Sequence, residues 1–149
     1  MIAIGCDPAG YVLAHRVIEH LKERGDECIF LGAYDVDNSH YPHFGEAVGL
    51  AVATGKADRG IVICGSGIGI SIAANKVPGV RAALCLDVPA AVTARRVLDA
   101  NVLAAGGRVV GAERFLDVVD AFFDTAFDEA NAAAVHAIAD AEALYLKKL

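Results

Sequence analysis

One of the four cysteines, Cys64, has a sequence context that differs from that of the other three. It ends an apolar run at 60–64, and three glycines follow within five residues, at 65, 67 and 69. Backbone N–H groups of such a loop, together with the start of a following helix, stabilise a negative charge. A thiolate beside an anion-binding loop suits acyl transfer or removal of a proton next to a carbonyl group. The alternative interpretation is a buried thiol beside a tight turn.

The remaining cysteines point to no metal site and no disulfide framework. Cys6, Cys28 and Cys85 lie in or beside apolar runs, and no pair has CxxC spacing. Thiols in such positions are usually reduced and buried, where they pack like small apolar side chains. We therefore expect neither a bound metal nor a disulfide.

Short apolar runs alternate with stretches of helical periodicity along the chain. Strands are expected at 2–6, 28–31, 60–64, 80–86 and 101–105, and helices at 9–24, 44–53, 70–76, 89–99, 112–127 and 131–148. A polar loop is expected at 32–43. Strands that are apolar throughout and alternate with helices are typical of a parallel sheet covered on both faces. We predict one three-layer α/β/α Rossmann-like domain over 1–149, with a five-stranded sheet and a C-terminal helix that packs in an oligomer.

Chemically active side chains follow several of these strands. Asp7 follows the first strand, Tyr41 lies in the long loop after the second, Cys64 and Ser66 end the third, and Arg108 follows the fifth. Ligands of such sheets bind at the carboxyl ends of the strands. One cleft is therefore expected to hold a thiol, a carboxylate, a phenol and an anion-binding loop.

Composition excludes several classes of protein. The chain has 149 residues, 56% of them hydrophobic and 21% charged, which is typical of one globular domain. A net charge of −6 argues against a nucleic-acid surface. No apolar run is long enough to span a membrane, and the first residues lack the basic region of a signal peptide. We expect a cytoplasmic protein.

The glycine loop also invites comparison with a dinucleotide-binding fingerprint. That fingerprint needs its glycines after the first strand and an acidic residue at the end of the second strand. Here the glycines follow the third strand, and the second strand ends in Leu31-Gly32. A nucleotide site is therefore disfavoured.

Several motifs together resemble the family of type B ribose-5-phosphate isomerases and galactose-6-phosphate isomerases. They are Ile-Gly-Cys-Asp at 4–7, Tyr-Pro-His at 41–43, Ile-Cys-Gly-Ser-Gly-Ile-Gly at 63–69, Ala-Ala-Asn-Lys at 73–76, Gly-Val-Arg-Ala at 79–82, Asn-Val-Leu at 101–103 and Gly-Arg-Val-Val-Gly at 107–111. The resemblance covers about 2–127, in order and at the family's spacing. It implies isomerisation between an aldose and a ketose form of a phosphorylated sugar, through a cis-enediolate and without a metal or organic cofactor.

The resemblance also implies a role for each matching residue around the thiol. Cys64 matches the base that moves a proton between C1 and C2, and Ser66 matches a hydroxyl that assists the thiol or the substrate oxygens. The backbone amides expected to bind the enediolate belong to Gly65, Gly67, Ile68 and Gly69.

Other matching residues are expected to bind substrate. Asp7 matches an acid that binds sugar hydroxyls or the ring oxygen, with a turn or helix-capping role as the alternative. Tyr41 matches a residue that lines the pocket, Arg108 matches an arginine that holds the phosphate, and Asn101 is counted with the substrate-binding residues.

The chain departs from the family pattern at three places. Pro8 stands where a histidine is usual, and Val97-Leu98 stand where a His-Asn pair that opens the sugar ring is usual. Residues 128–132 lack the Gly-Arg-His segment and the arginine that usually clamp the phosphate. The thiol half of the family's site is therefore present, and the ring-opening half is not.

Three alternatives follow from this pattern. The chain resembles the Cys-bearing subunit of the galactose-6-phosphate enzyme, which implies a heteromer with a His-bearing paralogue or a non-catalytic subunit. A homodimer or tetramer could instead act on a short sugar phosphate, such as a tetrose phosphate, that needs no ring opening; His40, His43 or His136 could also replace the missing histidine. A thiol hydrolase would need His40 or His43 to pair with Cys64 and is disfavoured.

Overall fold

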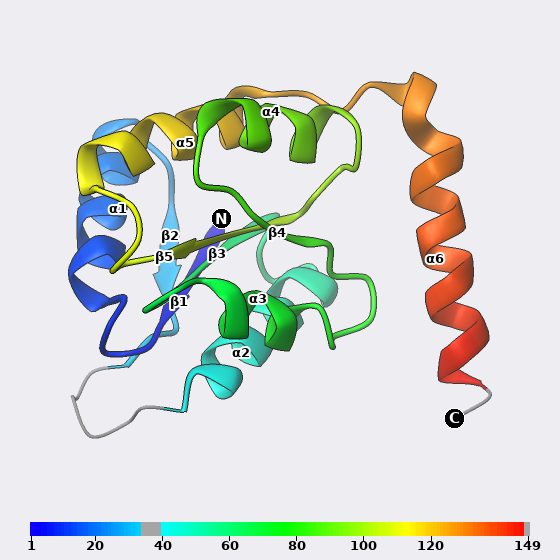
Figure 1. Ribbon diagram of the computed structural model, residues 1–149, viewed down its shortest axis with the longest axis horizontal. Coiled ribbons are helices and arrows are strands. Elements are labelled where there is room, and N and C mark those ends of the chain that lie inside the picture. Colours follow the sequence, from blue (N-terminus) through cyan, green and yellow to red (C-terminus); the bar gives the residue numbers. More distant parts are fainter. Residues whose placement is uncertain (34–39, 148–149) are drawn as a thin grey trace.

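A five-stranded parallel sheet forms the centre of the molecule, in the order β2-β1-β3-β5-β4 (Figure 1). The computed structural model describes residues 1–33 and 40–147. The strands are β1 (Ile2–Cys6), β2 (Cys28–Phe30), β3 (Arg59–Cys64), β4 (Ala82–Leu84) and β5 (Val102–Gly106). Every residue of β1 and β5 is buried, as the continuous apolar runs predicted.

Helices cover both faces of this sheet. They are α1 (Tyr11–Glu23), α2 (Tyr41–Ala53), α3 (Ile68–Ala74), α4 (Val88–Arg96), α5 (Ala112–Asp124) and α6 (Ala132–Leu146), with a 3₁₀ turn, η1 (Glu129–Asn131), before α6. Helices α1, α4 and α5 pack on one face, and α2 and α3 pack on the other. The predicted three-layer architecture is confirmed.

The two faces of β3 contribute to two separate cores. Ile61 and Ile63 pack with α1, α4 and α5, whereas Val62 and Cys64 pack with α2 and α3. This alternation follows from strand geometry, since successive side chains point to opposite faces. Burial of each large apolar side chain contributes about 1.5–3 kcal/mol. Cys64 is thus anchored in the core beneath α2 and α3.

Several element boundaries differ from the sequence-based expectations. The helix expected at 44–53 begins at Tyr41, which places Tyr41 and His43 in its first turn rather than in a loop. Pro42 accounts for this start, because the first turn of a helix needs no N–H donor. The strand expected at 80–86 is only three residues long, Ala82–Leu84. Positions 34–39 of the expected loop, and position 148 of the expected last helix, lie outside the described residues.

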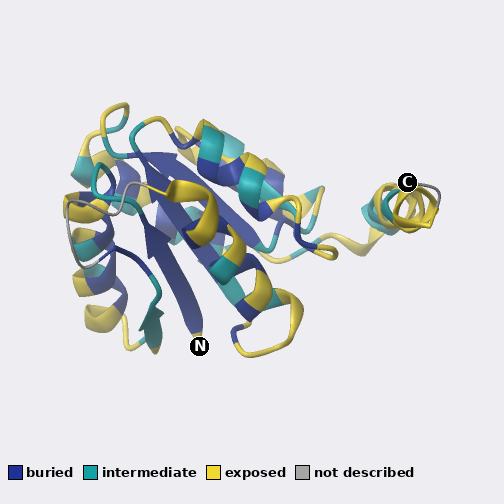
Figure 2. Cartoon of the chain, turned by 90° about the horizontal axis from the view of Figure 1, so that it is seen from below, coloured by how far each residue is buried: buried dark blue, intermediate teal, exposed yellow. Residues whose placement is uncertain are grey.

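Helix α6 stands away from the body of the molecule (Figures 1 and 2). None of its residues is buried, and Ile138, Leu144 and Tyr145 are all exposed apolar side chains. A hydrogen bond from the Gly79 amide to the Glu142 carboxylate, at 2.9 Å, links this helix to the body. Within 1–33 and 40–147, no helix is long and apolar enough to cross a membrane.

An ionic network fastens α1 to α5 on the surface. The carboxylate of Asp120 accepts hydrogen bonds from Arg24 and from His20, the latter at 2.7 Å. Arg24 also donates to Asp124 at 2.7 Å. Burial alone would raise the pKa of Asp120, but the hydrogen bonds from His20 and Arg24 outweigh burial and lower it. The charged form of Asp120 therefore stabilises the fold.

Replacement of this carboxylate gives a pH-dependent prediction. We expect Asp120→Asn to lower the free energy of unfolding by about 1 kcal/mol at pH 7, because Asp120 is partly exposed and solvent screens the pair. A carboxyl whose folded pKa is lowered stabilises above its unfolded pKa, and this contribution is lost as pH falls. Urea unfolding from pH 7 to pH 3 should thus show the variant and the wild type converging. Asp117→Asn, at an exposed position of the same helix, is the control and should show no such convergence.

Candidate active site

The loops after β1, β3 and β5 lie side by side at the carboxyl edge of the sheet. Strand register pairs Cys6 with Ile63 and Cys64 with Gly106. Beyond these pairs, the Asp7 amide donates to the Ile63 carbonyl at 3.2 Å, and the Gly107 amide donates to the Cys64 carbonyl at 2.8 Å. The loops that carry Asp7 and Arg108 therefore flank the loop that carries Cys64.

The Cys64 thiol receives a hydrogen bond from its own loop. The backbone N–H of Gly67 donates to Cys64 Sγ at 3.1 Å, and Cys64 is only 5% exposed. Gly67 has φ +79°, and a Cβ there would lie 2.6 Å from the Ala105 carbonyl carbon. Only glycine fits, because other residues would meet both steric conflict and left-handed backbone strain. The Gly67 N–H is therefore fixed in a position directed at the sulfur of Cys64.

The other three cysteines lie in surroundings that favour the neutral thiol. Burial raises the pKa of Cys6 to about 12 and that of Cys85 to about 11. Burial also raises the pKa of Cys28. These three thiols are protonated near neutral pH, and Cys64 differs from them in the backbone amide directed at its sulfur.

Ser66 and Ile68 stabilise the shape of the same loop. The Ile68 amide donates to Ser66 Oγ at 3.2 Å, and both residues are exposed. The amides of Gly67 and Ile68, both expected to bind an enediolate, thus already donate to side chains of the loop. A bound oxyanion would have to share or replace these acceptors.

Tyr41 and Arg108 both contact this glycine loop. A Cβ at Gly69 would lie 2.6 Å from Tyr41 Cε2, so the phenol ring covers this glycine. A Cβ at Gly65 would lie 3.7 Å from Arg108 Nη1, which places the guanidinium beside the residue after Cys64. The phenol and the guanidinium therefore approach the loop at two different points.

Asp7 has a local structural function. Its Oδ1 accepts a hydrogen bond from the Gly10 amide at 3.0 Å, in the turn that leads into α1. The turn role considered from the sequence is thus confirmed. The partly buried carboxylate stands one strand away from the thiol, and substrate binding by Asp7 stays a prediction.

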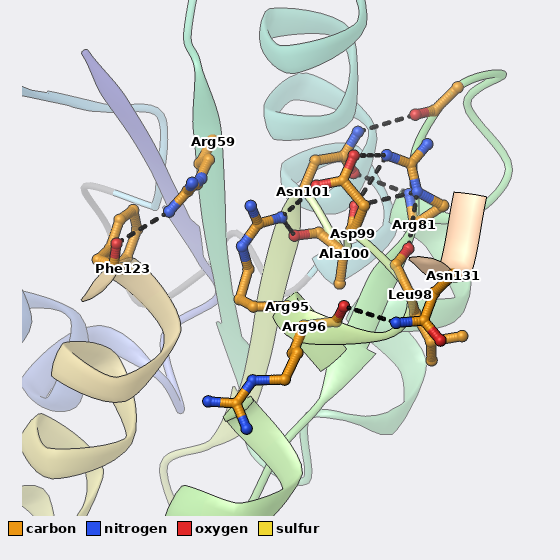
Figure 3. A network of polar contacts seen from close by, with 11 residues as sticks. Arg59, Arg81, Arg95, Arg96, Leu98, Asp99, Ala100, Asn101, Phe123 and Asn131 are labelled. Carbon is orange, nitrogen blue, oxygen red and sulfur yellow. Dashed lines mark hydrogen bonds and ion pairs between the residues drawn. The ribbon is translucent and has the colours of Figure 1, made fainter. Parts of the chain in front are cut away.

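Asn101 lies apart from the other candidate residues of this chain. It directly precedes β5, whose first residue, Val102, pairs with Gly60 at the amino end of the sheet. Its side chain accepts from the Arg81 amide at 2.8 Å and donates to the Gly79 carbonyl at 2.9 Å. Figure 3 shows Asn101 within a network of arginines around Asp99. Both ends of its amide bind backbone, and substrate binding by Asn101 stays a prediction.

The positions that depart from the family pattern lie at both edges of the sheet. Pro8 follows Asp7 at the carboxyl edge, whereas Val97 is the C-cap of α4 and Leu98 lies in the amino-end network of Figure 3. His40 and His43 stack on each other at the exposed start of α2, with ring centroids 5.6 Å apart. In the parts of the chain that the structure describes, no three His, Cys, Asp or Glu side chains form a group that could hold a metal ion.

One residue at this edge had no signal in the sequence. Leu84 ends β4, and its Cδ1 would lie 2.6 Å from a Cβ at Gly67. It therefore packs against the residue whose amide faces the thiol. A leucine at the end of a short apolar run predicts an ordinary core residue, so the contact with Gly67 is visible only in the folded chain.

A family described as Ribose/Galactose Isomerase matches residues 2–138. The chain belongs to the ribose/galactose isomerase family. It is 47% identical over 127 residues to ribose-5-phosphate isomerase B of Escherichia coli, with 85% of each chain covered. It is 43% identical to galactose-6-phosphate isomerase subunit LacB of Clostridium acetobutylicum, over 85% of this chain and 73% of the relative.

Two further comparisons bear on function and fold. The chain is 38% identical to D-erythrulose-4-phosphate isomerase of Pectobacterium atrosepticum, over 85% of this chain and 84% of the relative. The solved structure of Clostridium thermocellum ribose-5-phosphate isomerase B superposes with a TM-score of 0.94 at 47% identity, covering 97% of this chain and 98% of that one. Both the fold and the family expected from the sequence are confirmed.

Gly67 offers a direct test of the loop geometry. We expect Gly67→Ala to slow alkylation of Cys64 by iodoacetamide by about 100-fold, because the displaced amide no longer faces Sγ. Gly55→Ala is the matched control, since Gly55 has φ +73° but no atom within 4 Å of its Cβ position. Both variants share about 1–2 kcal/mol of backbone strain. Equal alkylation rates in the two folded variants, measured by peptide mass spectrometry, would contradict a role for the Gly67 amide.

Proposed function

We propose that this chain interconverts the aldose and ketose forms of a small phosphorylated sugar, with Cys64 as the base. The observation that carries the proposal is the hydrogen bond from the Gly67 amide to Cys64 Sγ at 3.1 Å. It pairs a sulfur base with a backbone donor at the strand edge where Asp7 and Arg108 also lie. Membership of the ribose/galactose isomerase family supports the same chemistry.

The proposed reaction is a proton transfer between neighbouring carbons. The Cys64 thiolate removes the C2 proton of the aldose, and the electron pair forms a C1–C2 double bond while the carbonyl oxygen becomes an enediolate oxygen. The thiol then returns the proton to C1, the C2 hydroxyl loses its proton to the C1 oxygen, and a ketose results. Nearby backbone donors lower the energy of the oxyanion. Formation of this anion is the main barrier when a proton is removed from a weak carbon acid.

The remaining candidate residues would bind substrate. Arg108 is a guanidinium suited to hold the phosphate, which in turn fixes the open-chain sugar. Tyr41 would form one wall of the pocket, and Asp7 would accept hydrogen bonds from sugar hydroxyls. Ser66 would assist the thiol or the substrate oxygens. No metal or organic cofactor takes part in the proposed chemistry.

The relatives' names leave three sugar lengths to consider. They are isomerases of ribose-5-phosphate, galactose-6-phosphate and D-erythrulose-4-phosphate. We propose a five- or six-carbon phosphate as the first candidate because of the higher identities to those two relatives. The apolar residues Val97 and Leu98, at the family's ring-opening positions, favour a four-carbon phosphate as the second. A tetrose 4-phosphate cannot form a five-membered ring, because phosphate blocks its O4, so no ring opening is needed.

The substrate and the base can be tested together. The isolated chain is offered tetrose, pentose and hexose phosphates in D₂O, and deuterium at C1 and C2 is followed by NMR. Turnover should occur with one length and fall by about 10²- to 10⁴-fold in Cys64→Ala. Cys28→Ser, at a half-buried thiol far from the loop, is the control and should keep full exchange. If the folded protein exchanges deuterium into none of these sugar phosphates, the result would contradict an enzyme that acts without a partner chain. It would favour a subunit that needs a His-bearing paralogue.

We also propose that a second copy of the chain covers α6, in a homodimer or tetramer. The helix exposes Ile138, Leu144, Tyr145 and Leu146, and an apolar helix face of this kind is unstable in water without a partner. Closed symmetric pairs of copies are the commonest solution. A heteromer with a paralogue would cover the same face. The cytoplasmic location expected from the sequence stays a prediction.

Oligomeric state gives the corresponding experiment. We expect wild-type protein at micromolar concentration to scatter light as a dimer or tetramer, and the Ile138→Asp, Leu144→Asp double variant to scatter as a monomer. Val12→Asp on α1 is the control, since Val12 is 77% exposed and can accept a charge without losing a contact. A monomeric wild type, or a double variant that still assembles, would contradict the proposed role of α6.

A further inference from the structure

Helix α3 connects the Cys64 loop to the edge strand of the sheet. It begins directly after Gly67 and ends at its C-cap, Asn75. The Asn75 side chain then binds the edge strand β4 twice. Its Nδ2 donates to the Ala82 carbonyl at 2.9 Å, and its Oδ1 accepts from the Ala82 amide at 2.7 Å. A side-chain amide thus occupies the hydrogen-bonding position that a neighbouring strand would otherwise take.

Strand β4 returns to the loop from which α3 starts. Two residues after Ala82, Leu84 places its Cδ1 where it would lie 2.6 Å from a Cβ at Gly67. The Ala105 backbone borders the same glycine, at 2.6 Å from that Cβ position. Gly67 is therefore enclosed between the β5 backbone and the Leu84 side chain, and its amide faces Cys64 Sγ at 3.1 Å.

Strand β4 is held on its inner side by β5, and the residue before it, Arg81, is held by Asn101 and Asp99. The strand has three residues at the edge of the sheet and pairs only with β5, from Ala82–Val102 to Leu84–Ala104. Its residues are half-buried or exposed. On the outer side of β4, the pair of hydrogen bonds to Asn75 therefore takes the place of a neighbouring strand. A shift of this strand would move Leu84 away from Gly67.

We propose that Asn75 is a positioning residue for the Cys64 thiol. By pairing with Ala82 it fixes β4, so that Leu84 packs on Gly67 and keeps its N–H directed at Cys64 Sγ. Asn75 acts through Leu84 and Gly67 and does not itself touch the thiol. Its effect on turnover rests on the proposed function, whereas its effect on the reactivity of Cys64 does not.

The test measures the reactivity of the thiol in variants at both ends of this connection. Asn75→Ala and Leu84→Ala should each slow iodoacetamide alkylation of Cys64, located by peptide mass spectrometry, by about threefold to tenfold, since a hydrogen bond to an anion is lost in part. The double variant should be no slower than the slower single variant, because both changes act on the same contact. Asn75 is exposed, so its loss leaves no buried unpaired group of its own.

Asn101 supplies a matched control with the same chemistry. Its side-chain amide also pairs with backbone on both sides, at the Gly79 carbonyl and the Arg81 amide. Arg81 is additionally held by Asp99, and the contact lies at the opposite edge of the sheet from the thiol. Asn101→Ala should therefore lower the melting temperature about as much as Asn75→Ala and leave the alkylation rate of Cys64 unchanged.

Turnover adds a second measurement that a general loss of stability does not reproduce. With the substrate found in the D₂O panel, Asn75→Ala should lower kcat and leave KM near the wild-type value, because Arg108 and Tyr41 are untouched. Additive effects of Asn75→Ala and Leu84→Ala, or equal alkylation rates in Asn75→Ala, Asn101→Ala and the wild type, would overturn the proposal. If Cys64→Ala retained isomerase activity, the proposed function would fail while the alkylation result still decided the role of Asn75.

Discussion

The hydrogen bond from the Gly67 amide to the sulfur of Cys64 imposes the main geometric constraint on the carboxyl edge of the sheet. It requires a backbone turn with φ +79° directly above the end of β5, in a space that leaves no room for a side chain. A carbon acid needs its base fixed within a few tenths of an ångström of the productive position. The buried strand β3 provides this rigidity from below, and α3 and β4 provide it from the side.

The parallel sheet brings the other groups to the same edge. Strands β1, β3 and β5 are adjacent and end at the same level, so the Asp7 and Arg108 loops meet the thiol loop without any long-range adjustment. Tyr41 is positioned by a helix instead of a loop, because α2 begins at this residue. The Tyr41 ring packs on Gly69. The site therefore consists of short loops on a rigid core, where most positions are set by strand register.

The sequence was sufficient to predict the sheet, the glycine-rich loop after Cys64 and the family. Each of these depends on local patterns, namely apolar runs, spaced glycines and motifs in a fixed order. It did not show at which end of a strand a given residue lies. Asn101 belongs to a stretch that resembles the family, yet it precedes β5 and so lies at the amino edge. The contact of Leu84 with Gly67 joins distant segments through an edge strand, and no local pattern encodes it. Tyr41 was read as a loop residue because polar residues precede it.

The amino edge of the sheet is joined to the segment that leads into α6. At the amino edge, the Arg96 carbonyl accepts from the Asp128 amide at 3.0 Å and from Asn131 Nδ2 at 3.4 Å, the latter drawn in Figure 3, so the segment before α6 is fixed beside the end of α4. Val97 and Leu98, where the family usually has its ring-opening pair, lie at that same end of α4. Val97 and Leu98 carry no ionisable group, so the side chains that we propose for proton transfer lie at the carboxyl edge, around the Cys64 loop.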